Sequence, residues 1–146
     1  LLATAAESEA SRRAAVAAAR RPLSEGRSVI LHTSLGPADT RTRTGVEATS
    51  DLSERLGLAL AAILESLLVS TGLRRAVVCG GDTSTHVARA LGIEALEFLA
   101  PAAPGSPLCR VHASARVVDG CDIVFKGGQV GRDAFFLDVL NGTHIP

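Results

Sequence analysis

Methionine, tryptophan and tyrosine are absent from these 146 residues, and phenylalanine occurs only four times. Apolar residues still make up 47% of the chain, so a disordered chain is excluded and the predicted core is aliphatic. A chain of this length is expected to form a single domain over residues 1–146. Because Met is absent and the sequence opens on Leu1, we expect a piece of a longer protein.

Neither sign of charge is in excess, because 15 Lys and Arg balance 15 Asp and Glu. This balance argues against nucleic acid and against a polybasic membrane surface as partners. No apolar run reaches the length of a membrane span and no signal peptide is evident, so we expect a cytoplasmic protein without a membrane partner.

Cysteine is scarce, with three residues and no CxxC spacing, which favours a reducing compartment over a disulfide scaffold. A zinc site can be drawn from Cys109, His112 and Cys121. That spacing lacks a second ligand pair, so we expect these residues to belong to strands or the core, and we expect no metal-ligating cluster.

Lysine is almost missing as well: Lys126 is the only Lys beside fourteen Arg. It stands before two glycines, Gly127 and Gly128. A compact ammonium on a flexible stem fits between phosphate oxygens in a way that a planar guanidinium does not. Lys126 is therefore a candidate phosphate stabiliser, with chance as the competing explanation.

The most informative stretch runs from Ala76 to Gly92. It is typical of a short apolar strand (76–79), a Gly80–Gly81 turn and a helix that ends at Gly92. Asp82, Thr83 and Ser84 favour the helix N-cap, and such a helix start binds anions through free backbone N–H groups. A capped strand–helix turn that binds nothing fits the same pattern.

Elsewhere the spacing of apolar residues predicts alternating helices and strands. Helices are expected over 4–20, ended by Pro22, and over 51–71 and 132–140; strands over 28–34, 93–99, 108–113 and 122–126, with 116–118 continuing the sheet. Loops are expected over 36–50 and, because of three prolines, over 100–107. The fold class is α/β: a mostly parallel sheet with helices on both faces, a Rossmann-like three-layer nucleotide-binding domain.

Two predicted strands, 76–79 and 122–126, each lead into a glycine loop and then a helix. In a doubly wound sheet such loops share the carboxyl edge, where ligands bind. In the expected loop 36–50, Arg41 and Arg43 could also meet an anion, but a solvated loop is the better interpretation.

Three common catalytic patterns are missing. The sequence has no GxxxxGK[ST], no GxGxxG after a strand and no GxSxG elbow. These absences exclude a P-loop NTPase and a hydrolase built on Ser84 and His86, and they weaken a dinucleotide interpretation.

The order Gly80-Gly81-Asp82-Thr83, followed about forty residues later by Lys126-Gly127-Gly128-Gln129-Val130-Gly131, resembles the C-terminal nucleotide-binding domain of the four-carbon acid sugar kinases. Some members of that family carry a type III effector label. The resemblance covers roughly residues 25–142. Gly127 and Val130 depart from the Ser and Phe that many members have at these places.

The resemblance implies an ATP-dependent kinase of carbohydrate metabolism that phosphorylates a hydroxyl of a four-carbon sugar acid and uses ATP with Mg²⁺. The nucleotide would contact Gly80, Gly81, Asp82, Thr83, Lys126, Gly127, Gly128 and Gly131. The small sugar acid would bind an N-terminal domain that is missing here, so the catalytic base is unknown and this chain alone is expected to be inactive. A homo-oligomer, a nucleotide or dinucleotide domain of another α/β enzyme, and a non-catalytic anion-binding module all stay open.

Overall fold

The computed structural model describes residues 5–33, 50–128 and 130–142. These described residues form four helices and four strands. They are α1 (Ala5–Ser24), α2 (Ser50–Thr71), β1 (Arg75–Cys79), α3 (Gly81–Ala90), β2 (Ile93–Ala103), β3 (Ser106–Ala113), β4 (Asp122–Lys126) and α4 (Phe135–Asn141).

The sheet is mixed, with strand order β1-β4-β3-β2. Only β1 and β4 run parallel, whereas β4 with β3 and β3 with β2 are antiparallel. The α/β class is confirmed, but the prediction of a mostly parallel, Rossmann-like sheet is wrong. The reason lies at Pro104–Gly105, where two residues join β2 to β3, and a connection this short permits only an antiparallel hairpin.

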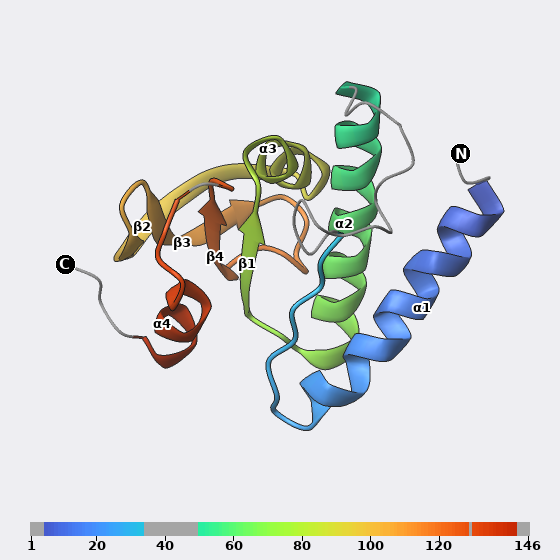
Figure 1. Ribbon diagram of the computed structural model, residues 1–146, viewed down its shortest axis with the longest axis horizontal. Helices are drawn as coiled ribbons and strands as arrows, with labels where there is room; N and C mark the ends of the chain where they lie inside the picture. The colour runs from blue at the N-terminus through green and yellow to red at the C-terminus, as the bar shows by residue number, and fades with distance from the viewer. Residues whose placement is uncertain (1–4, 34–49, 129, 143–146) are drawn as a thin grey trace.

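Helices cover both faces of the sheet (Figure 1). On one face, α2 and α3 bury residues such as Leu68 and Val87 against Val111 and Ile123 of the sheet. On the other face, Phe135 at the start of α4 packs with Val124. Ile123 and Val124 are neighbours in β4, so the two clusters occupy opposite faces of the same strand.

The α2–α3 contact is unusually close. A Cβ atom added at Gly57 of α2 would lie 2.3 Å from the Cβ of His86 in α3. No side chain other than hydrogen fits at position 57 in this packing, so Gly57 sets how near α3 comes to α2. Since the start of α3 follows β1 directly, this contact also helps to place the loop between them.

The outer helix α1 packs on α2 through Ala19, Ile63 and Leu67. It extends past Pro22, where we expected it to end, and reaches Ser24. A proline in the last turn costs one backbone hydrogen bond, and its fixed φ is compatible with a helix.

Three further predictions fail. Residues 28–33 form no strand, although Val29 packs against the α1–α2 cluster. The predicted loop 100–107 is mostly strand, and residues 116–118 form a turn, with Val118 buried beneath α2 and α3. Most of the predicted loop 36–50, including Arg41 and Arg43, lies outside the described residues.

Candidate functional site

The first glycine loop joins β1 to α3. Gly80 has φ 108°, which side chains rarely adopt, and an added Cβ would lie 3.1 Å from Thr83 Oγ1. The N-cap is Gly80, two residues before Asp82, the first of the predicted caps, and no side chain caps the helix by a hydrogen bond. Asp82, Thr83 and Ser84 therefore lie in the first turn rather than at the N-cap.

The free donors of this loop follow from its hydrogen bonds. Ser84 N–H donates to the Gly80 carbonyl, which is the first bond inside the helix (2.8 Å). The N–H groups of Gly81, Asp82 and Thr83 precede it and have no partner within the helix. A Cβ added at Gly81 would meet no atom within 4 Å. The helix start is therefore open on this side and presents donors and the positive end of its dipole.

The second glycine loop follows β4. Lys126, the last residue of β4, donates from Nζ to the Gly127 carbonyl (3.0 Å) and lies over the Phe135 ring, 5.4 Å from the ring centre. Gly131 has φ 90°, and a Cβ there would lie 3.0 Å from Lys126 Cε. Gly128 has open space around it, whereas a Cβ at Gly127 would press on Val130.

The two loops meet at the carboxyl ends of β1 and β4. Cys79 and Lys126 are register partners, and the Gly80 N–H donates to the Lys126 carbonyl (2.8 Å). The prediction that the two loops share one sheet edge thus survives the change of topology, because the one parallel pair is the pair that carries both loops. An ammonium and a free helix start at one edge suit an anion.

Cys79 is a residue of this edge that the sequence patterns did not single out. It is exposed, whereas Cys109 and Cys121 are buried. Desolvation raises the pKa of the Cys79 thiol, and the nearby Lys126 ammonium partly offsets that rise. Its place directly before Gly80 makes it a natural reporter for whatever binds at the loops.

The zinc alternative finds no support in the described residues. His112 is exposed and pairs with Glu97, while the thiols of Cys109 and Cys121 contact backbone carbonyls. No group of three or more His, Cys, Asp or Glu in the described part of the chain is arranged to hold a metal ion.

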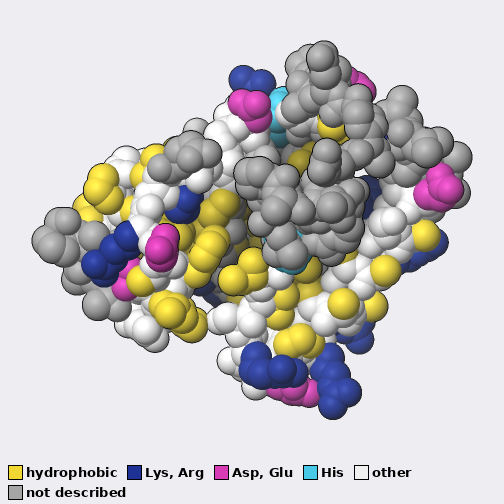
Figure 2. All heavy atoms as spheres, in the orientation of Figure 1, with side chains coloured by type: hydrophobic (Ala, Val, Ile, Leu, Met, Phe, Trp, Pro, Cys, Tyr) yellow, Lys and Arg dark blue, Asp and Glu magenta, His cyan; other side chains and the backbone are white. Residues whose placement is uncertain are grey.

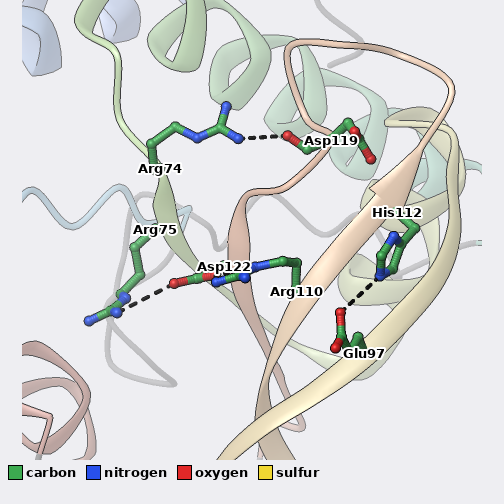
Figure 3. Close-up of polar contacts among 7 residues, drawn as sticks. All are labelled: Arg74, Arg75, Glu97, Arg110, His112, Asp119 and Asp122. Atoms are coloured by element: carbon green, nitrogen blue, oxygen red, sulfur yellow. Dashed lines mark hydrogen bonds and ion pairs between the residues drawn. The ribbon is translucent and has the colours of Figure 1, made fainter.

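The opposite end of the strands carries paired charges (Figure 3). Asp122 at the start of β4 accepts from Arg75 (3.4 Å) and Arg110 (3.1 Å), which lie on the two neighbouring strands. Arg74 donates to the Asp119 carbonyl (2.6 Å). These arginines are occupied in tying β1, β3 and β4 together, so they do not contribute to the glycine loops at the far edge.

Residues 1–136 match the family described as a nucleotide-binding C-terminal domain. The chain is 43% identical over 135 residues to a 3-oxo-isoapionate kinase of Paraburkholderia graminis, and 37% identical over 103 residues to a 3-oxo-tetronate kinase of Burkholderia multivorans. These alignments cover 87% and 68% of this chain.

The chain belongs to the nucleotide-binding C-terminal domain family of the four-carbon acid sugar kinases. The expected family is confirmed, and its named relatives are kinases. The chain spans 28% and 22% of the length of the two relatives above, so it corresponds to a part of such a kinase.

Solved structures agree on the fold of this kinase-family domain. A protein of Salmonella typhimurium LT2 superimposes with a TM-score of 0.59 over 97% of this chain and 32% of its own, at 19% identity. A domain of unknown function from Bordetella bronchiseptica, solved with bound citrate as a domain-swapped dimer, gives a TM-score of 0.52 at 24% identity, over 66% of this chain and 23% of its own. Among the described helices of the present chain, none combines the length and the apolarity needed to cross a membrane.

Proposed function

We propose that this chain is the ATP-binding part of a cytoplasmic kinase that transfers the γ-phosphate to a hydroxyl of a four-carbon sugar acid of the tetronate or 3-oxo-tetronate type. One observation carries the proposal: the Gly80 N–H donates to the Lys126 carbonyl, so the uncapped start of α3 lies at the same sheet edge as the end of β4, from which the Lys126 side chain extends to Phe135. The kinase names of the relatives support the same reaction class.

In this proposal the backbone does most of the binding. The N–H groups of Gly81, Asp82 and Thr83 would donate to phosphate oxygens, and Lys126 would neutralise their charge. The open space at Gly81 and Gly128 leaves room for close approach. Phosphoryl transfer depends mainly on such positioning and charge neutralisation, so few side chains need take part in bond breaking.

Magnesium fits as a companion of the phosphates. The described residues offer no ready-made cluster for a cation, but Asp82 lies exposed in the first turn of α3. Mg²⁺ commonly binds through one or two carboxylates together with phosphate oxygens. Asp82 would then hold the ion directly or through water, and bound Mg²⁺ would neutralise charge on the transferring phosphoryl group.

The sugar acid and the catalytic base would lie in a part of the kinase outside this chain. We therefore expect the isolated 146 residues to phosphorylate nothing, and turnover of a sugar acid by them would contradict that expectation. A homo-oligomer is also part of the proposal. It is supported by the domain-swapped dimer of the Bordetella bronchiseptica protein, which has a similar fold.

Thiol modification of Cys79 tests the nucleotide site. Because Cys79 is exposed next to Gly80 and the other two thiols are buried, a thiol reagent should modify it first. ATP or ADP with Mg²⁺ should slow that reaction, and NAD should not. The Cys79→Ser variant should lose this first, fast modification, which would assign that reaction to Cys79.

The outcomes separate the alternatives. Protection by NAD in place of ATP would identify a dinucleotide domain of another enzyme. If no nucleotide slows the modification, and calorimetry detects no heat of ADP binding, a non-catalytic anion-binding module takes the place of the kinase proposal.

A further inference from the structure

The Lys126 side chain makes three contacts. Its Nζ donates to the Gly127 carbonyl, its Cε lies against Gly131, and its ammonium lies over the ring of Phe135. A lysine at the end of a strand would ordinarily sample many rotamers, and fixing one costs conformational entropy. Here a carbonyl, a glycine and an aromatic face hold the ammonium in one place before any ligand arrives.

Phe135 is well suited to this task. It is 1% exposed, so its ring is fixed by the core of Val124, Ala102 and Ala103. The next residue, Phe136, touches the Phe135 ring edge to face, with ring centres 5.5 Å apart, and is 43% exposed. Figure 2 shows hydrophobic side chains at the surface over α4. The exposed hydrophobic residues of this helix are Phe136, Leu137 and Leu140. The two adjacent phenylalanines therefore differ in burial and in their contact with Lys126: Phe135 is buried and contacts the ammonium, whereas Phe136 is exposed.

We propose that Phe135 is a positioning residue of the phosphate site, which acts through the face of its ring on Lys126. The inference rests on the proposed function. A cation over an aromatic face is attracted by the ring quadrupole, most strongly where water is partly excluded. One N–H of Lys126 is engaged by the Gly127 carbonyl, and the other two stay available for phosphate oxygens. The ring therefore holds the charge in place without consuming its donors.

A double-mutant cycle tests this role. ADP affinity is measured by calorimetry for the parent protein, Phe135→Leu, Lys126→Met and the double variant, with Mg²⁺ present. Phe135→Leu should weaken ADP binding by roughly threefold to thirtyfold, the range expected for one lost cation–π contact. In the Lys126→Met background the same change should have no further effect, because the ring has no cation to position.

Phe136→Leu is a control for the same chemical change at the exposed neighbour, away from the ammonium, and the Lys126→Met background controls for the loss of packing at the buried position 135. Phe136→Leu should leave ADP affinity unchanged. An equal loss for Phe135→Leu in both backgrounds would show that the ring acts by packing alone and would overturn the proposal, as would no loss at all with Lys126 present.

Two safeguards keep the test decisive. If Phe135→Leu does not fold, fluorinated phenylalanines at position 135 keep the shape of the ring and weaken its negative face in steps, so ADP affinity should fall with each added fluorine. A flat series would overturn the proposal. If the parent protein itself binds no ADP, the proposed function fails first, which is a different outcome from an uncoupled cycle in a protein that binds ADP.

Discussion

Gly57→Ala perturbs the contact that places α3, and its effect can be worked out from one distance. The new Cβ would lie 2.3 Å from His86 Cβ and 3.4 Å from His86 Cα. Non-bonded carbon atoms rest about 3.5–4.0 Å apart, so the two helices must separate by about 1.2–1.7 Å to reach an ordinary contact. Neither carbon belongs to a flexible side-chain end, and no change of rotamer relieves the overlap.

Two opposing energies decide whether Gly57→Ala raises or lowers the free energy of unfolding. Ala favours an α-helix over Gly by about 0.8–1.0 kcal/mol. Overpacking of a core typically costs about 1–3 kcal/mol and occasionally more, and this overlap between two Cβ atoms belongs at the upper end. We expect Gly57→Ala to lower the free energy of unfolding by about 1–2 kcal/mol. In urea titrations this appears as a lower midpoint of unfolding with an unchanged m-value.

Second-site changes at His86 identify the cause. His86→Ala keeps the Cβ atom, so it should not rescue Gly57→Ala. His86→Gly removes that atom and should restore about 1 kcal/mol or more through a favourable coupling energy. A Gly57→Ala protein that unfolds at a higher urea concentration than its parent would refute the close approach of α2 and α3.

Further predictions concern the loops and one buried hydroxyl. Gly80→Ala should destabilise the protein by about 1 kcal/mol or more because φ is 108°, whereas Gly81→Ala should not destabilise it and should weaken only ADP binding; thermal unfolding and calorimetry separate the two. Ser106 is 1% exposed and its Oγ has no hydrogen-bond partner in the described structure, so Ser106→Ala should raise the unfolding free energy by roughly 1 kcal/mol in urea titrations, and a loss would disprove the unpaired state. A raised pKa leaves less Cys79 thiolate at a given pH, so its alkylation rate should keep rising with pH above the usual thiol range. Lys126→Ala should shift that rate profile to still higher pH, because the ammonium lowers the thiol pKa, and an unmoved profile would count against the contact.

Local patterns carried much of the prediction. The apolar spacing in 51–71 and the runs 76–79 and 122–126 predicted α2, β1 and β4 to within about one residue, since each is long enough or apolar enough to outweigh its surroundings. The two glycine loops also lie where the order of elements predicted them. The site residues themselves stay a prediction, because their ligand contacts are untested.

The predictions that failed concern structure that depends on pairing between segments distant in the sequence. Three prolines predicted a loop over 100–107, but Pro101 lies in β2, which is an edge strand where a missing N–H is tolerated. Once the Pro104–Gly105 turn is recognised as a hairpin, the antiparallel half of the sheet follows. Gly57 and Phe135 escaped notice because each matters through one contact with another element, which no local periodicity encodes.

The Gly80–Lys126 hydrogen bond also creates a boundary in amide hydrogen exchange. The Gly80 amide makes the last hydrogen bond between β1 and β4. It is expected to exchange slowly, because its exchange requires the end of this strand pair to open. The next three amides, of Gly81, Asp82 and Thr83, have no acceptor within α3 and should exchange almost as fast as in an open chain. The backbone thus changes from a bonded to an unbonded amide between Gly80 and Gly81, and an anion bound at the helix start should slow exchange at the three unbonded amides.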